Sequence, residues 1–145
     1  MFKRILLPVD GSEASGRAVL AGVDFARSLG AEVIAMTATP SFHTFTMDAG
    51  MLEQTREDYA RTSRAHGQRM LEGVAAAARD AGVPCTNVQI TSDEPYEAII
   101  SAARDQGCDL IVMASHGRRG IKGLLLGSET QKVLVHSAIP VLVYR

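Results

Sequence analysis

The sequence predicts an α/β protein built on a single open, five-stranded parallel sheet with helices on both faces. The main observation is that short apolar runs alternate with longer segments whose apolar residues recur at helical spacing. A second is that several of the short runs are apolar throughout, as in strands covered on both faces. Such alternation implies right-handed crossovers and hence parallel strands. Because no repeat, low-complexity tract or linker interrupts the pattern, residues 1–145 are expected to form one domain.

The first two strands flank a helix that has clear boundaries. The run RILLPV (4–9) is the first strand, and AEVIAMTA (31–38) is the second. Between them, Ser12 is a suitable N-cap. Gly30 follows the last apolar residue of the helical pattern and is expected to end it.

The middle of the chain predicts an irregular segment and then a long helix. Residues 39 to about 50 show no period, and a helix is expected over roughly residues 51–81. Its first half is polar almost all round and is expected to protrude or fray, whereas its second half carries an apolar face. The segment CTNVQITS (85–92) alternates, as in a strand nearer a sheet edge.

The last third supplies two more strands and two more helices. Pro95 and the two acidic residues before it open a helix. The run CDLIVMAS (108–115) is the strongest strand signal in the chain. A helix near residues 128–136 and a final strand in IPVLVYR (139–145) complete the order β-α-β-α-β-α-β-α-β.

Composition excludes several classes of function. The net charge is −1 and the pI is about 6.4, so no overall basic field is present to hold nucleic acid. The apolar run near the start is short and broken by Pro8, and no run approaches the roughly 18 residues that span a bilayer. Cys85 and Cys108 match no metal or redox spacing. These features predict a cytoplasmic protein with reduced cysteines and no membrane partner.

The functional residues are expected at the carboxyl ends of the strands, where open parallel sheets bind ligands. Asp10, residues 37–39 and residues 92–93 lie at such ends. The segment ASHGRRGIKGLLLGSET (114–130) follows another and holds four glycines within eleven residues, against an average usage of about 7%.

This glycine-rich segment has two readings. Glycines allow positive φ and close approach of a ligand, and their N–H groups together with a following helix N-terminus bind anions. Arg118, Arg119 and Lys122 would add mobile cations, and Ser128 would either cap the helix or offer its hydroxyl to a phosphate. In the alternative, the segment is a flexible turn before a capped helix. The residues alone leave both open.

Other known site patterns fail at their decisive positions. After the first strand, GSEASGRA (11–18) resembles a P-loop, but Arg17 replaces the lysine and Ala18 the hydroxyl residue. A dinucleotide fingerprint and a nucleophile elbow are absent, and of a phospho-receiver's acids only Asp10 fits cleanly. The four histidines have no metal-ligand spacing, and His116 suits a phosphate neighbour better than a general base. No catalytic residue and no metal site are therefore predicted.

Two long stretches resemble universal stress protein domains. They are KRILLPVDGSEAS at the amino end and VMASHGRRGIKGLLLGSETQKVLVHSAIPVLVYR at the carboxyl end. The likeness covers essentially the whole chain, with only residues 39 to about 68 non-diagnostic. It implies an adenine nucleotide α-hydrolase-like, Rossmann-like fold. ATP-binding members carry G-x2-G-x9-G-[ST]; here the corresponding residues are Ala114, Gly117, Gly127 and Ser128, so alanine replaces the first glycine.

The resemblance implies an ATP site that carries Mg²⁺ or Mn²⁺ on the phosphates. Gly117 and Gly127 would contact phosphates through their backbones with help from Ser128, Asp10 would lie by the nucleoside, and residues 35–37 would line the adenine pocket. The methyl group of Ala114 is expected to change affinity rather than abolish binding. The residues expected at the nucleotide site are Pro8, Val9, Asp10, Ala35, Met36, Thr37, Ala114, Ser115, His116, Gly117, Arg118, Gly120, Gly127, Ser128, Glu129 and Thr130.

The function predicted on this basis is a nucleotide-dependent stress-response regulator with slow or no hydrolysis. The resemblance also implies a homodimer through the last strand (139–145), whose apolar edge would otherwise be guarded only by Arg145. Regulatory protein partners are expected but not identifiable. Two alternatives stay open: an interaction module of the same fold without nucleotide, and a slow ATPase or nucleotidyl-transfer enzyme.

Overall fold

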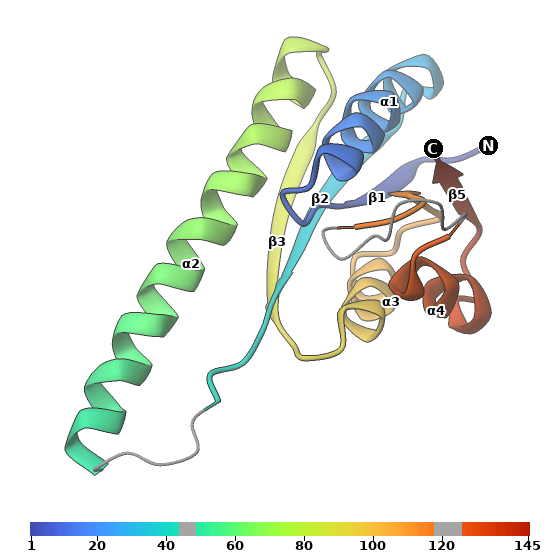
Figure 1. Ribbon diagram of the computed structural model, residues 1–145. Coiled ribbons are helices and arrows are strands. Elements are labelled where there is room, and N and C mark those ends of the chain that lie inside the picture. Colours follow the sequence, from blue (N-terminus) through green and yellow to red (C-terminus); the bar gives the residue numbers. More distant parts are fainter. Residues whose placement is uncertain (44–48, 118–125) are drawn as a thin grey trace.

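A computed structural model describes residues 1–43, 49–117 and 126–145. Its five strands are parallel and lie in one open sheet in the order β3-β2-β1-β4-β5 (Figure 1). The strands are β1 (Arg4–Pro8), β2 (Glu32–Thr39), β3 (Cys85–Thr91), β4 (Leu110–Ala114) and β5 (Val141–Tyr144). The predicted fold class and element order are confirmed.

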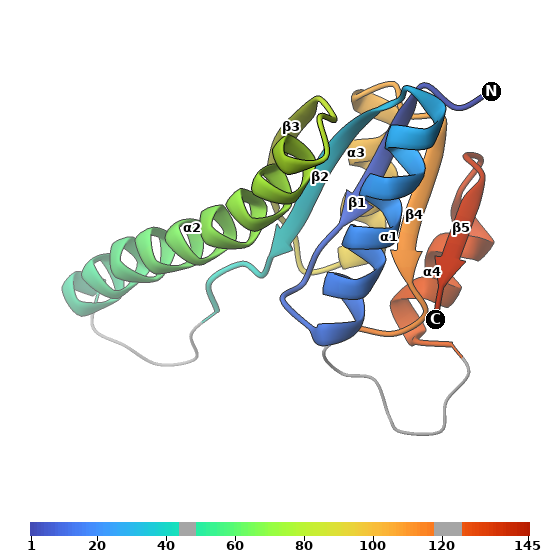
Figure 2. The same ribbon diagram turned by 90° about the horizontal axis from the view of Figure 1, so that it is seen from above.

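Within the described residues, four helices cover the two faces of the sheet. They are α1 (Glu13–Leu29), α2 (Ala49–Asp80), α3 (Pro95–Asp105) and α4 (Ser128–His136). Figure 2 shows α1 in front of β1 and β4, with α3 behind them. Because successive strand residues point to opposite faces, Leu7 packs among residues of α1 and α2, whereas Leu6 packs among residues of α3 and α4.

The boundaries of α1 follow the local signals in the sequence. The Ser12 hydroxyl accepts a hydrogen bond from the Ser15 N–H at 3.1 Å, which caps the amino end. Gly30 adopts the left-handed conformation with φ of 63° and closes the carboxyl end, as predicted. The glycine is required there because residues with a Cβ rarely adopt this conformation.

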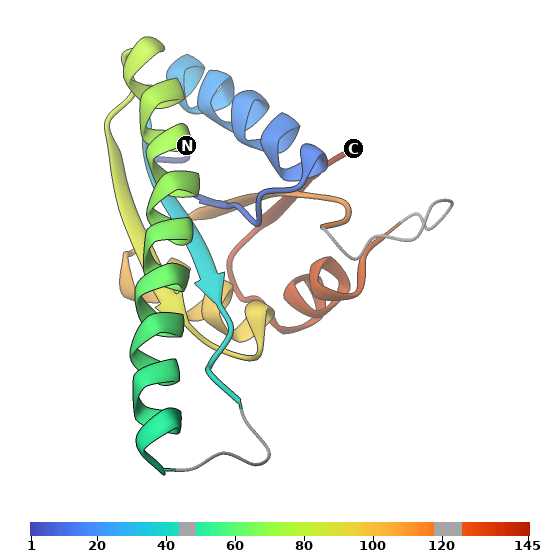
Figure 3. The same ribbon diagram turned by 60° about the vertical axis from the view of Figure 1, so that its left-hand side comes forward.

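The long helix α2 has two different halves. Leu71, Val74 and Ala78 in its second half are buried against β1 and β2, together with residues of α1. The first half extends past the carboxyl ends of the strands, as predicted for a segment that is polar nearly all round (Figure 3). In the described ranges no helix is long and apolar enough to cross a membrane.

Candidate functional site at the ends of β1 and β4

The candidate site lies where two neighbouring strands connect to helices on opposite faces of the sheet. β1 leads into α1 on one face, whereas its neighbour β4 leads toward α4 on the other. We call the region between the carboxyl ends of these two strands the crevice, because it is the usual ligand position in an open α/β sheet. Asp10 follows β1, and Ser115, His116 and Gly117 follow β4.

Asp10 and Gly117 bring the two strand ends together. The Asp10 carboxylate accepts a hydrogen bond from the Ser12 N–H at 2.9 Å, within the turn that leads into α1. A Cβ added at Gly117 would overlap Oδ2 of Asp10. Gly117 is not among the glycines with positive φ. The absence of a side chain at Gly117 therefore serves close approach, not an unusual backbone conformation.

Gly127 brings the amino end of α4 against the end of β4. It is the N-cap residue, with φ of −70°, and its N–H donates to the Ser115 carbonyl at 2.6 Å. A Cβ at this position would lie 3.0 Å from the His116 Cα and 3.3 Å from the Ser115 oxygen. A side chain at Gly127 would thus push α4 away from the strand end.

The amino end of α4 has no side-chain cap among the described residues. The N–H groups of the first helical turn have no intrahelical partner, and the helix dipole adds partial positive charge at the same place. Ser128 is the first residue of the helix and is exposed, so its hydroxyl does not cap α4. Because the Gly127 N–H is bonded to Ser115, the donors available to an anion are those of the residues that follow.

Two further hydrogen bonds hold α4 and β5 to the end of β4. The buried Thr130 hydroxyl donates to the Ala114 carbonyl at 3.0 Å. The Ser115 N–H donates to the Tyr144 carbonyl at 2.8 Å, and the Ser115 hydroxyl lies 3.1 Å from Nδ1 of His116. Thr130 and Ser115 therefore fix the position of the crevice walls.

The Glu129 carboxylate is directed to a neighbouring helix. It accepts a hydrogen bond from the Tyr96 N–H at 2.9 Å, in the first turn of α3. It also contacts Nζ of Lys132 at 3.3 Å, and this hydrogen bond is the main cause of the raised pKa of Lys132. Glu129, expected in the nucleotide site, thus makes contacts that link α4 to α3.

Ala114 occupies the position of the motif glycine, and its methyl group is part of the protein core. The residue is 7% exposed and packs with Ala14 and Ala18 of α1. Its methyl group therefore fills space between β4 and α1. Ala114 therefore contributes to the packing of β4 against α1.

The residues expected around adenine are buried at the end of β2. Ala35 packs toward α1 and α2, and Met36 packs toward α3 and α4. The Met36 carbonyl accepts a hydrogen bond from the Val9 N–H at 2.8 Å. Thr37 is 1% exposed, and its hydroxyl has no hydrogen-bond partner among the described residues. Pro8 and Val9 are half-buried beside them, whereas Arg118 and Gly120 lie outside the described residues.

Metal and thiol chemistry receive no support from the described residues. Among them, no group of three or more His, Cys, Asp and Glu side chains could hold a metal ion. Cys85 and Cys108 are both free thiols. Burial raises the pKa of Cys108 to about 11, which keeps it protonated at neutral pH.

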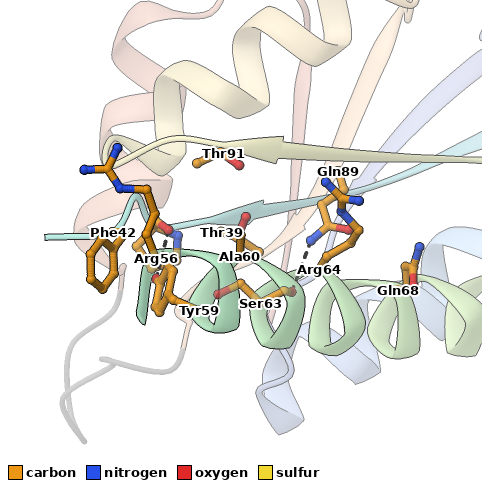
Figure 4. A pocket seen from close by; sticks show the side chains of 11 residues that line it. Thr39, Phe42, Arg56, Tyr59, Ala60, Ser63, Arg64, Gln68, Gln89 and Thr91 are labelled. Carbon is orange, nitrogen blue, oxygen red and sulfur yellow. Dashed lines mark hydrogen bonds between the residues drawn. The ribbon is translucent and has the colours of Figure 1, made fainter. Parts of the chain in front are cut away.

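One groove in the structure was not predicted from the sequence. A groove of about 350 Å³ lies between the first half of α2 and the ends of β2 and β3 (Figure 4). Six of its residues, at positions 56, 59, 60, 63, 64 and 68, follow a helical spacing that places them on one face of α2. This spacing could have indicated the groove from the sequence. It gave no visible pattern, because the segment is polar nearly all round and no single face stands out.

The fold and the crevice define a doubly wound α/β protein whose candidate ligand site lies at the switch point of the sheet. The chain belongs to the universal stress protein family, because the model of that family matches residues 1–145. It is 30% identical to Universal stress protein YxiE of Bacillus subtilis, over the full length of both chains.

Solved structures show the same fold. The structure of hypothetical protein MJ0577 has a TM-score of 0.83 and 28% identity, and the match covers 99% of this chain and 95% of that one. A universal stress protein in complex with cAMP has a TM-score of 0.73 at 23% identity, covering 99% of this chain and 97% of that one. A family protein from Arabidopsis thaliana with AMP bound has a TM-score of 0.68 at 17% identity, covering 97% and 90%.

Proposed function

We propose that this universal stress protein binds ATP at the crevice between β1 and β4 and acts as a nucleotide-dependent regulator in the stress response. The observation that carries the proposal is the uncapped amino end of α4, which Gly127 brings against the end of β4. Backbone N–H groups at such a helix end bind phosphate. Structural relatives with cAMP, AMP and dAMP bound support an adenine nucleotide as the ligand class.

Each part of the nucleotide has a candidate partner. The first-turn N–H groups of α4 and the exposed Ser128 hydroxyl suit the phosphates. Asp10, at the end of β1, suits the ribose hydroxyls. The family resemblance assigns the adenine ring to the backbone of residues 35–37, where the Met36 carbonyl already accepts the Val9 N–H.

The divalent ion, Mg²⁺ or Mn²⁺, would be held through phosphate oxygens and water. The described residues offer no cluster of ligands for it, and Mg²⁺ usually binds through substrate phosphates with few protein ligands. Its contribution would be to neutralise the charge of the triphosphate. The protein's own contribution is the array of N–H donors at α4.

Hydrolysis is expected to be slow or absent. This expectation rests on the sequence, in which Arg17 stands where a P-loop carries the lysine that reaches the phosphates. The nucleotide would then act by its occupancy, biasing conformation or partner choice, and we place this activity in the cytoplasm.

We also propose a homodimer that forms through β5. This strand lies at the edge of the sheet, so its outer backbone groups have no neighbouring strand among the described residues. Leu142 and Tyr144 are 37% and 38% exposed, and Val135 of α4 is 76% exposed. An exposed apolar edge strand of this kind tends to pair with another chain.

Nucleotide binding is tested by extraction and by titration. The purified protein is denatured and the supernatant is analysed by mass spectrometry for adenine nucleotide, and ATP-Mg is titrated calorimetrically into nucleotide-free protein. We expect binding that Gly127→Val abolishes, because its side chain would meet the His116 backbone. Gly73→Val is the control, since a Cβ at that exposed site in α2 meets nothing within 4 Å.

Two results would reject the proposal. If no nucleotide is extracted and millimolar ATP-Mg changes neither the heat signal nor the melting temperature, the alternative of an interaction module without nucleotide holds. If Gly127→Val binds ATP as tightly as Gly73→Val does, the amino end of α4 is not the phosphate site. Phosphate release above background that disappears in Gly127→Val would instead favour an enzyme.

A further inference from the structure

The groove beside α2 is separate from the proposed nucleotide site. It is lined by Thr39, Pro40, Phe42, Arg56, Tyr59, Ala60, Ser63, Arg64, Gln68, Gln89 and Thr91. None of these residues belongs to the crevice at β1 and β4. The groove is instead built by β2 and β3, at the opposite side of the sheet from β5. A volume of about 350 Å³ falls within the range of small-molecule sites.

The charge of the groove is positive. Arg56 and Arg64 line it, whereas no Asp or Glu does. Within the described part of the chain, neither arginine forms an ion pair, although Arg61 on the same helix pairs with Asp58. Figure 4 shows both arginine side chains reaching from α2 toward β3, with Arg64 extending toward Gln89. Two guanidinium groups that are not neutralised by carboxylates favour an anionic occupant.

One end of the groove carries an apolar wall. The rings of Phe42 and Tyr59 lie 5.4 Å apart at an interplanar angle of 46°. The Tyr59 hydroxyl donates to the Pro40 carbonyl at 2.9 Å, which holds the ring in place. Flat aromatic and proline surfaces of this kind suit a planar apolar body.

The opposite end of the groove is closed by a tight contact between α2 and β3. The Gln89 amide donates to the Ser63 carbonyl at 3.3 Å. A Cβ at Gly67 would overlap the amide end of the Gln89 side chain, so a larger residue at this position would displace that side chain. Gln89 pairs with Thr37 in the register of the sheet, two pairs deeper than Thr39, and Thr37 itself does not line the groove. The closed end is therefore lined by polar groups.

We infer that this groove is a second ligand site, which binds a small organic anion with a planar apolar body. Arg56 and Arg64 bind its anionic group, a phosphate, carboxylate or sulfonate, and Phe42 and Tyr59 contact its body. The site acts independently of the nucleotide crevice. Because the groove joins α2 to the ends of β2 and β3, its occupancy fixes the protruding half of α2 relative to the sheet.

The probe is 8-anilinonaphthalene-1-sulfonate, an aromatic sulfonate with a planar naphthalene ring, whose fluorescence rises on binding. It is titrated into the full chain, and ¹H–¹⁵N spectra locate its contacts. We expect Arg56→Gln and Arg64→Gln each to weaken binding by about fivefold or more, since each removes a charge-assisted contact. Arg69→Gln is the matched control, because it removes the same charge from α2 at a position outside the groove.

Two further arms separate this site from the nucleotide site. Saturating ATP-Mg and the Gly127→Val substitution are both expected to leave probe binding unchanged, while the spectral shifts centre on Gln89 and Thr91. Equal probe binding by Arg56→Gln, Arg64→Gln and Arg69→Gln would overturn the inference. Displacement of the probe by ATP, with loss of binding in Gly127→Val, would also overturn it, because the groove would then be part of the nucleotide site. In that outcome the proposed function survives.

Discussion

The Asp10 carboxylate lies directly against the backbone of Gly117, so that a side chain at position 117 would have to displace it. The same carboxylate accepts the Ser12 N–H that begins the turn into α1. One acidic residue therefore connects the start of α1 to the segment that leads toward α4.

Gly117→Ala should weaken nucleotide binding and lower stability. The new methyl group would overlap Oδ2 and force Asp10 to rotate away from the Ser12 N–H. We expect a loss of about 1 kcal/mol in the free energy of unfolding and about tenfold in ATP affinity, measured by urea titration and calorimetry.

Gly16→Ala in α1 is the control for this substitution. A Cβ at Gly16 meets nothing within 4 Å, so alanine should raise the free energy of unfolding by about 0.5–1 kcal/mol. If Gly117→Ala has the stability and ATP affinity of the wild type, the close approach of Asp10 to Gly117 contributes to neither property.

Ala114→Gly should lower stability without improving the site. The methyl group packs with Ala14 and Ala18, and its loss combines with the greater backbone freedom of glycine. We expect a decrease of about 1–2 kcal/mol in urea titrations and a change of less than about threefold in ATP affinity. A large gain in affinity would mean that the methyl group obstructs the nucleotide.

Thr37→Val should stabilise the protein, whereas Thr130→Val should destabilise it. Both hydroxyls are buried, but only that of Thr130 has a partner, the Ala114 carbonyl. Removing the unpaired hydroxyl should raise the free energy of unfolding by about 1 kcal/mol, and removing the paired one should lower it by about 1–2 kcal/mol. If Thr37→Val is instead the more damaging substitution, its hydroxyl has a partner in solution.

Leu142→Glu should convert the proposed dimer to a monomer. A charge on the exposed edge of β5 would oppose pairing with a second copy. Light scattering after size exclusion should show the mass fall from twice the chain's 15.5 kDa to that value. Leu20→Glu on α1, where the leucine is 60% exposed, should leave the mass unchanged. A wild-type monomer, or a dimer in Leu142→Glu, would reject pairing through β5.

Cys108 should make stability fall at alkaline pH and should react slowly with thiol reagents. Its pKa is raised by burial from 9.0 to about 11, so the unfolded chain loses this proton first as pH rises. The contribution of Cys108 to stability is therefore complete below about pH 9 and lost between about pH 9 and 11. Urea titrations of wild type and Cys108→Ala across that window measure it as a difference. Labelling of Cys108 as fast as the half-buried Cys85 at pH 8 would contradict the burial.

Much of the fold was predictable because its signals are local. The Ser12 cap and the Gly30 stop depend on a few neighbouring residues, and both were confirmed. The bounds of α4 also agree with the prediction of residues 128–136. Buried parallel strands read as continuous apolar runs, so β1, β2 and β4 were found to within about two residues.

The candidate site was predicted from the sequence only as a region, and its ligand stays a prediction. Glycine richness suggested positive φ, but Gly127 has φ of −70°, and Gly117 and Gly127 serve close contacts with Asp10 and with the His116 backbone. Glu129 was grouped with the nucleotide residues because it begins the same helix, yet its carboxylate caps the first turn of α3. Spacing along one chain does not reveal which distant segment a side chain will meet.

By itself, then, the amino-acid sequence determined the order of strands and helices, their ends and the edge of the sheet where a ligand would bind. These follow from periodicity and capping, which act over a few residues. The tertiary structure alone decided that Asp10 meets Gly117, that the Ala114 methyl group belongs to the α1 interface, and that α2 and β3 enclose a groove. Those contacts join residues far apart in the chain, and they exist only once the helices pack on the sheet.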